Sequence, residues 1–317
     1  MNGNQAFRAA CVLRGVGRSL LIAIQFIFAN VGHSDEPNKN LSSFETIKRD
    51  EQQKADVDES GSALGVNDLL VIRHGDLPII ISAPHGGKLA VPGAIPRKGD
   101  GLATGAAGFR MARDSGTEEL ALLVVDELDE RMEGSPTCVI SRVHRKFVDF
   151  NRPPDIGVEH QQARIVYDLY HQTLREAVAE VRERHGFGLL VDIHGQGSSK
   201  TTVYRGTGNG LTTRGLQERS GTRAHAGEQS LNGLLTRRGW SMHPDPFDGR
   251  EQAGFTGGHI VRSYGSHQPN GIDAVQLEFG ADYRTAANRR KYAEELAEAI
   301  VEYSRLYLNQ PQPVTRP

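Results

Sequence analysis

The sequence contains very little cysteine: Cys11 and Cys138 are the only two in 317 residues. Because Cys11 lies in a segment that reads as a removable leader, an internal disulfide framework and a cysteine-rich zinc site are both excluded. Any metal must therefore be held by histidine and carboxylate side chains.

Neither sign of charge is in large excess, since the formal net charge is −2. The segment 66–317 is close to neutral, because most of the imbalance lies nearer the N-terminus. A near-neutral body lacks the basic field that nucleic-acid binding usually needs, so no nucleic-acid partner is expected. There is no internal repeat, and the 38% hydrophobic and 24% charged residues are typical of a globular protein with a core.

No apolar run near the N-terminus is long enough to span a bilayer, which takes about 20 residues. The run LLIAIQFIFANV covers 20–31, follows a basic stretch that ends at Arg18, and precedes small and polar residues. This pattern predicts a signal peptide over 1–34, cleaved between 29 and 34, and a periplasmic or secreted protein. No stable membrane insertion is expected after cleavage, and an uncleaved anchor is the alternative.

The rest of the chain divides by composition. Residues 35–65 hold eight acidic and four basic side chains with scattered Gly and Ser, which is typical of a disordered linker. Residues 309–317 are predicted to be a disordered tail. Residues 66–308 have the size of one larger catalytic domain.

Within that domain, strand-like and helix-like patterns alternate. Apolar runs predict two short strands around a turn in 68–87, and further strands after 137, in 187–195 and in 271–280. Amphipathic periodicity predicts helices from 114 to 134, from 158 to 184 and from 284 to 308. The expected fold class is α/β, with a mixed β-sheet flanked by helices on both faces.

Two predicted strands end in a histidine followed by glycine, at His85 and at His194. Asp192 and His194 are two residues apart on a strand and so face the same way, as a carboxylate that orients a ligating imidazole must. Taken singly, each histidine could equally be a polar residue at a strand end. Together they are candidate metal ligands.

A second polar cluster lies in the later part of the strand-like segment that begins at 137 and continues to the proline pair at 153–154. It contains Arg145, Asp149, Asn151 and Arg152, and the prolines after it turn the chain out of the strand. Guanidinium and amide donors suit a substrate carboxylate, which arginine binds through two hydrogen bonds. The alternative is a surface ion pair between Asp149 and an arginine.

A carboxylate closes the last strand, where alternation places Glu278 and Gln276 on one face. Glu278 is a candidate general base. The glycine-rich loops 205–210 and 254–258 are expected to form walls of the pocket.

Five short motifs carry a family resemblance. They are PHGG (84–87), RKFVDFNR (145–152), DIHG (192–195), GGHIVRSYG (257–265) and QLEFG (276–280). In this order they resemble the N-formylglutamate amidohydrolase family, which is similar in turn to zinc carboxypeptidases and aspartoacylase. The resemblance implies a zinc-carboxypeptidase-like fold, one catalytic zinc, and hydrolysis of an amide next to a carboxylate in a small molecule or short peptide.

The resemblance also implies roles for single residues. His85 and His194 would be zinc ligands, Glu278 the general base, and the substrate carboxylate would lie against Arg145, Asn151 and Arg152. Carboxypeptidases have a glutamate three residues after the first histidine, where this chain has Lys88. The third ligand must then come from elsewhere, and Asp114, at the start of a predicted helix, matches an acidic position that the amidohydrolase family also shows there, so the resemblance implies Asp114. Glu118 is the fallback, and a helix N-cap is the other interpretation of Asp114.

Rival functions follow from the same residues. An exported zinc carboxypeptidase or a γ-glutamyl or cell-wall peptide hydrolase would use the same zinc chemistry. A zinc- or ligand-binding relative without turnover is the non-enzymatic alternative. The Arg73-His74-Gly75 triplet of histidine phosphatases is set aside, because it is expected inside a hairpin and not before a helix.

Overall fold

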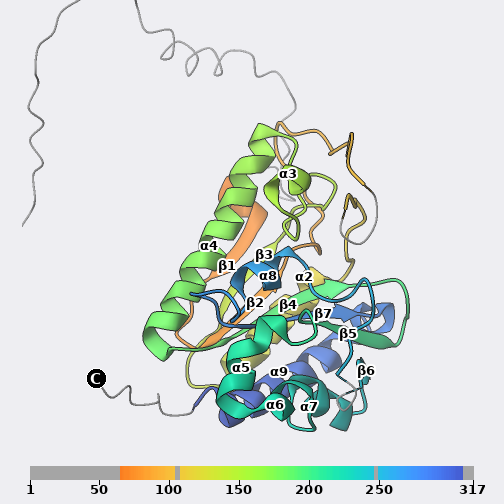
Figure 1. Cartoon of the computed structure of the whole chain (residues 1–317). Helices are drawn as coiled ribbons and strands as arrows, with labels where there is room; N and C mark the ends of the chain where they lie inside the picture. Colours follow the sequence, from red (N-terminus) through yellow and green to blue (C-terminus); the bar gives the residue numbers. More distant parts are fainter. Residues whose placement is uncertain (1–64, 104–107, 246–248, 310–317) are drawn as a thin grey trace, which may run out of the picture. The chain divides into compact units, whose positions relative to one another are not determined.

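The computed structural model describes residues 65–103, 108–245 and 249–309 (Figure 1). The predicted signal peptide, the predicted linker up to residue 64 and the tail from residue 310 lie outside these ranges, so those interpretations stay predictions. Among the helices of the described part, none is both long enough and apolar enough to cross a membrane.

A seven-stranded mixed sheet forms the centre of the described structure, with the strand order β1-β3-β2-β4-β7-β5-β6. Four neighbouring strands, β3, β2, β4 and β7, run parallel, while β1 and β5 pair antiparallel with their neighbours β3 and β7. The strands are β1 (Leu70–Arg73), β2 (Ile79–Ala83), β3 (Thr137–Ser141), β4 (Leu189–Gly195), β5 (Thr202–Gly206), β6 (Ser241–His243) and β7 (Asp273–Phe279).

Helices cover both faces of this sheet (Figure 1). The α-helices are α2 (Thr117–Arg131), α3 (Pro154–Gly157), α4 (Gln161–His185), α5 (Arg214–Ser220), α6 (Thr222–Ala226), α7 (Leu231–Arg237), α8 (His259–Tyr264) and α9 (Arg289–Tyr307). Short 3₁₀ helices are η1 (Val66–Leu69), η2 (Leu211–Thr213) and η3 (Ala281–Arg284). The predicted α/β class with a mixed, doubly covered sheet is confirmed.

Alternation along the central strands divides the apolar side chains between two cores. Ile79 and Ile81 of β2 pack with α2 and α9, whereas Ile80 packs with α4 on the other face. On β4 and β7 the same period of two places Asp192, His194 and Glu278 on the α4 side. The polar residues of the site therefore share one face near the carboxyl ends of parallel strands.

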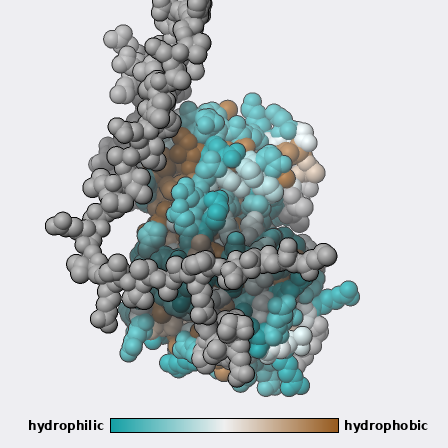
Figure 2. All heavy atoms as spheres, turned by 60° about the vertical axis from the view of Figure 1, so that its left-hand side comes forward, coloured by the Kyte–Doolittle hydropathy of each residue, from teal (hydrophilic) through white to brown (hydrophobic). Residues whose placement is uncertain are grey.

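The surface is mainly hydrophilic on the face shown in Figure 2, with hydrophobic residues in separate places in the upper part of that view. The large hydrophobic side chains exposed in the described part are those of Val66, Ile95, Met111 and Ile165. Most other large hydrophobic side chains are buried in the two cores, as expected for a folded domain.

The predicted hairpin in 68–87 is wrong. β1 and β2 are both strands, but β1 pairs antiparallel with β3, which lies between β1 and β2 in the sheet. Two short consecutive strands are consistent with either arrangement, and only the position of β3 decides between them. The histidine of the Arg-His-Gly triplet follows an edge strand, so it still opens no helix.

Several short elements were not predicted. They are β5, β6 and the helices α5 to α8, each between three and seven residues long. Elements of this length show too few turns or alternations for a periodic signal, and packing against neighbouring elements decides their conformation. The strand after 137 is also shorter than expected and ends at Ser141, well before the proline pair.

Candidate metal centre and active site

Three chain segments bring the candidate metal ligands together. His85 lies two residues after β2, His194 lies near the end of β4, and Asp114 lies three residues before α2. Because β2 and β4 are adjacent and parallel, their carboxyl ends meet at one edge of the sheet. This is the edge at which ligand chemistry gathers in such folds.

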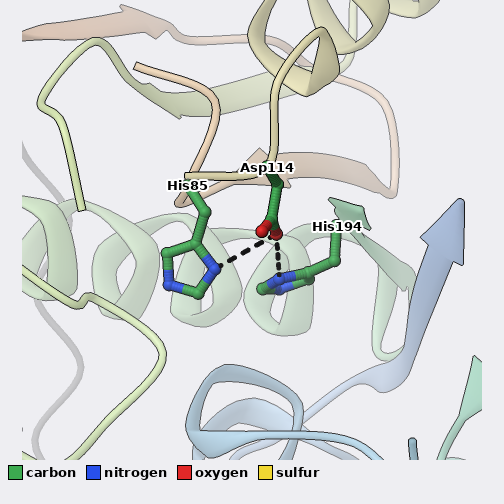
Figure 3. A group of neighbouring side chains, drawn as sticks. All are labelled: His85, Asp114 and His194. Atoms are coloured by element: carbon green, nitrogen blue, oxygen red, sulfur yellow. Dashed lines mark ion pairs between the residues drawn. The ribbon is translucent and has the colours of Figure 1, made fainter. Parts of the chain in front are cut away.

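The three side chains converge on one point, and each is buried (Figure 3). One nitrogen of His85, one nitrogen of His194 and one oxygen of Asp114 lie within 4.8 Å of one another. The Nδ1 atoms of both imidazoles are 3.4 Å from Asp114 Oδ2. Among the described residues, this is the only such group of three that could hold a metal ion.

The structure rejects the N-cap interpretation of Asp114. Gly116 occupies the N-cap position of α2, and no side chain caps that helix. The carboxylate of Asp114 instead accepts a 3.0 Å hydrogen bond from the backbone N–H of Gly195, next to His194. The fallback ligand, Glu118, lies on α2 with its carboxylate 3.8 Å from Arg142 and outside the group of three.

Hydrogen bonds set the orientation of both imidazoles. Nε2 of His85 donates to Asp149 Oδ1 at 2.7 Å, and Nε2 of His194 donates to Asp192 Oδ2 at 2.8 Å. Each Nδ1 then presents a lone pair toward Asp114, and Nδ1 of His85 has no hydrogen-bond partner. Lone pairs that face a carboxylate need a cation between them, which a proton or a metal ion would supply.

The donor set fits zinc in particular. Two imidazoles and one carboxylate form a usual set of three protein ligands for a catalytic zinc, and the outer imidazole nitrogens bonded to carboxylates are the usual supporting contacts. The residues therefore fit the metal that the family resemblance implies.

Electrostatics in the site follow from burial and close opposite charges. Burial lowers the pKa of His194, but Asp192 and Asp114 outweigh it and raise that pKa to about 10. Burial raises the pKa of Asp114, but His194 and His85 outweigh it, so the pKa falls well below the ordinary value. Metal binding at Nδ1 of His194 would therefore compete with a proton there.

Asp149 orients His85 through a hydrogen bond, a role that the sequence did not reveal. The expected alternative was a surface ion pair, and Asp149 does pair with Arg145, at 2.7 Å, but both side chains are buried. Asp149 Oδ1 binds His85 while Oδ2 accepts from Arg145 Nε at 2.8 Å. Arg145, predicted as a substrate ligand, therefore lies in the cleft wall with its guanidinium bound to Asp149.

We predict that Asp149→Asn lowers zinc affinity about 10–100-fold, the usual effect of removing an outer-shell carboxylate. The amide can still accept a hydrogen bond from His85, but it carries no charge to balance Arg145. Competition with a metal chelator measures the affinity, and Asp192→Asn provides the matched variant for the second imidazole. An unchanged affinity in both variants would show that these carboxylates do not support metal ligands.

Glu278 lies beside His194 in register on the adjacent strand β7. Burial raises its pKa to about 7, with Asp114 adding to the increase and His194 opposing it. Gln276, two residues earlier on the same face, donates Nε2–H to Glu278 Oε1 at 2.9 Å. One oxygen of the carboxylate is thereby held, which leaves the other to take a proton.

Backbone groups orient the amides next to Glu278. The N–H of Gly258 donates to Gln276 Oε1 at 2.8 Å, so Nε2 must face Glu278. The N–H of Ile260 donates to Asn151 Oδ1 at 2.9 Å, and Asn151 Nδ2 donates to Gln276 Oε1 at 3.1 Å. Asn151, predicted to bind substrate, is thus also a structural link between its own loop and β7.

A cleft of about 1080 Å³ surrounds these residues, and His85, Asp114, His194 and Glu278 all line it. Of the two glycine-rich loops, 254–258 contributes to the cleft wall and 205–210 does not. In the latter, the N–H groups of Thr207 and Asn209 bind the buried Glu251. The arginines that line the cleft are Arg110, Arg113, Arg145, Arg152, Arg284 and Arg289.

The comparison with protein families agrees with this geometry. Residues 157–283 match the family model of N-formylglutamate amidohydrolase. The resemblance is thereby confirmed, and the matched segment contains the last three of the five motifs, with His194, Gln276 and Glu278. His85, Asp114 and the arginine cluster precede it. The match supports a hydrolase that acts on a carbon–nitrogen bond.

Solved structures with similar folds include an N-formylglutamate amidohydrolase from Ralstonia eutropha JMP134 (15% identity, 75% of this chain and 98% of that chain covered, TM-score 0.48). A gene product from Agrobacterium tumefaciens is 16% identical over 75% of this chain and 95% of its own (TM-score 0.46). The succinylglutamate desuccinylase from Chromobacterium violaceum is 16% identical over 74% and 64%, respectively (TM-score 0.36). No curated protein sequence matches this chain.

Proposed function

We propose that this protein is a zinc-dependent amidohydrolase that cleaves an amide bond next to a carboxylate, with N-formylglutamate or another N-acyl amino acid as substrate. The observation that carries the proposal is the convergence of His85, Asp114 and His194 next to a buried glutamate in an arginine-lined cleft. The match to the amidohydrolase family supports the type of bond.

When bound, zinc would polarise the amide carbonyl and lower the pKa of the attacking water to about 7. Glu278 would take a proton from that water on the oxygen that Gln276 does not hold, and would pass it to the leaving nitrogen. Gln276 bonds the carboxylate directly, and Asn151 holds Gln276 in place.

The substrate carboxylate is assigned to Arg152, whose charged group lines the cleft and whose Nε and Nη1 donate to Gly108 O and Asn151 O. These backbone contacts keep the guanidinium in place before substrate arrives. Arg145 adds positive charge from behind, where its own contacts are to Asp149.

For Arg152→Ala we predict a rise in KM of about tenfold to a hundredfold with zinc content unchanged, because a charge-assisted hydrogen bond is worth about 1.5–3 kcal/mol. Steady-state kinetics and metal analysis of the same preparation measure both quantities. If a substrate and its carboxamide analogue were cleaved equally well, no carboxylate would be bound in this cleft.

A peptide substrate is the second candidate, favoured by the volume of the cleft. About 1080 Å³ slightly exceeds the range of about 300–1,000 Å³ that is usual for small-molecule sites. An exported carboxypeptidase or a γ-glutamyl or cell-wall peptide hydrolase would use this space. Comparing kcat/KM for N-formylglutamate with that for a γ-glutamyl dipeptide separates the two candidates.

The experiment that tests the proposal is metal analysis of the purified protein together with turnover assays on N-formyl and N-acyl derivatives of glutamate and aspartate. We expect about one zinc per chain and hydrolysis of at least one of these amides. Zinc without turnover would indicate the non-catalytic relative, and neither zinc nor turnover would refute the proposal.

We also propose that the protein is exported, from the basic and then apolar segment 1–34. The predicted outcome is a native protein outside the cytoplasm that begins near residues 30–35. N-terminal sequencing of the native protein measures this directly. Recovery of a soluble cytoplasmic protein that begins at Met1 would refute export.

A further inference from the structure

One arginine contacts three of the segments that carry site residues, those of Asp114, His194 and Glu278. Arg284 ends η3, just after β7, and its guanidinium lines the cleft. It donates from Nη1 to the carbonyl oxygen of Ser115, from Nη2 to that of Gln196 at 3.2 Å, and from Nε to that of Phe279 at 3.1 Å. All three acceptors are backbone atoms.

Each of these carbonyls belongs to a residue one or two positions after a site residue. Ser115 follows Asp114, Gln196 lies two residues after His194, and Phe279 follows Glu278. The ends of β4 and β7 are already paired with each other in the sheet, whereas the loop before α2 belongs to neither strand. The three donors of one rigid, planar guanidinium therefore link the ligand loop, the ligand strand and the strand of the general base.

The backbone around the guanidinium is shaped for its approach. A Cβ atom at Gly195 would lie 2.6 Å from Arg284 Cζ, closer than such atoms can come. A Cβ atom at Gly116, where φ is +89°, would lie 2.4 Å from the carbonyl oxygen of Arg284. Gly195 also donates its N–H to Asp114 and directly follows His194. The glycine that leaves room for the guanidinium therefore also links these two proposed metal ligands.

The positive charge of Arg284 interacts with the carboxylates of Asp114 and Glu278. Burial lowers its pKa, while Asp114 and Glu278 act in the opposite direction. A lysine in its place would keep the charge but could not reach three separated carbonyls with a fixed geometry.

We propose that Arg284 is a positioning residue of this active site: it holds the loop of Asp114 against the paired ends of β4 and β7 at the spacing that metal binding and proton transfer require. The proposal rests on the proposed zinc site. It assigns no contact between Arg284 and substrate.

The test measures zinc affinity by chelator competition and the absorption spectrum of the cobalt-substituted protein, in addition to kinetics. For Arg284→Gln we expect zinc affinity to fall about 10–100-fold, as for other residues that orient metal ligands, together with a changed cobalt spectrum and a lower kcat. We expect Arg284→Lys to recover only part of the zinc affinity and of kcat. Arg290→Gln removes an equal charge from an exposed position nearby and serves as the control.

A second variant acts on the same contact from the other side. Gly195→Ala keeps the arginine at position 284, but the added methyl group would push its guanidinium aside. This variant should therefore also weaken zinc binding. If both changes act through one contact, the double variant should bind zinc no more weakly than the worse single variant, whereas independent effects would add. Should Arg284→Gln fail to fold, the folded Gly195→Ala variant decides.

The outcomes are distinct. A lower melting temperature with unchanged zinc affinity and cobalt spectrum would make Arg284 a structural residue only and overturn the inference, as would additive effects of the two changes. Failure of the unmodified protein to bind zinc would overturn the proposed function, and the inference with it.

Discussion

Glu278→Gln is expected to reduce kcat by about 10²–10⁴-fold while KM, zinc content and melting temperature stay close to their original values. Glutamine has nearly the shape of glutamate and can still accept the hydrogen bond from Gln276, so β7 and its neighbours keep their packing. What the variant loses is a carboxylate oxygen that takes up a proton. Steady-state kinetics at saturating substrate measures the loss.

Three interpretations of Glu278 are separated by this one variant. A general base loses kcat alone. A metal ligand would lose zinc, and added zinc would restore activity. A purely structural carboxylate would lose stability and keep kcat, and a kcat close to the original would contradict the mechanism.

Removal of either histidine is expected to have the other large effect. His85→Ala and His194→Ala each take away one of three proposed ligands and leave a buried carboxylate, Asp149 or Asp192, without its imidazole partner. Zinc should then be lost during purification and activity should fall to background. Metal analysis of the purified variants gives the result directly.

A histidine outside the site provides the matched control. His225 is largely buried and bonds Thr213, away from the proposed ligands. His225→Ala should therefore keep its zinc even if it is less stable. Stoichiometric zinc in the His85→Ala/His194→Ala double variant would refute the assignment of the metal site.

Local patterns determined much of the site before the fold was known. The period of two along a strand places Asp192 with His194, and Gln276 with Glu278, on common faces whatever the neighbouring strands are. The glycines after His85 and His194 indicate sharp turns at strand ends. Because these relations span only two or three residues, the sequence alone was sufficient for them.

Contacts between distant segments could not be obtained in this way. The choice between Asp114 and Glu118 depended on where the loop before α2 passes the end of β4, and the pairing of β1 depended on β3. Asp149 reads as a surface ion-pair partner in the sequence, and only its burial against His85 gives it a supporting role.

The sequence by itself therefore determined the α/β class, the strand ends that carry the histidines and Glu278, and the donor chemistry of the site, since each is encoded in periodicity or residue type. The tertiary structure alone decided the third ligand, the burial of Asp149 against His85 and the contacts of Arg284 with the segments of Asp114 and His194. These depend on the spatial meeting of residues far apart in the chain, such as Gly195 and Asp114, and packing of the whole sheet brings them within hydrogen-bonding distance.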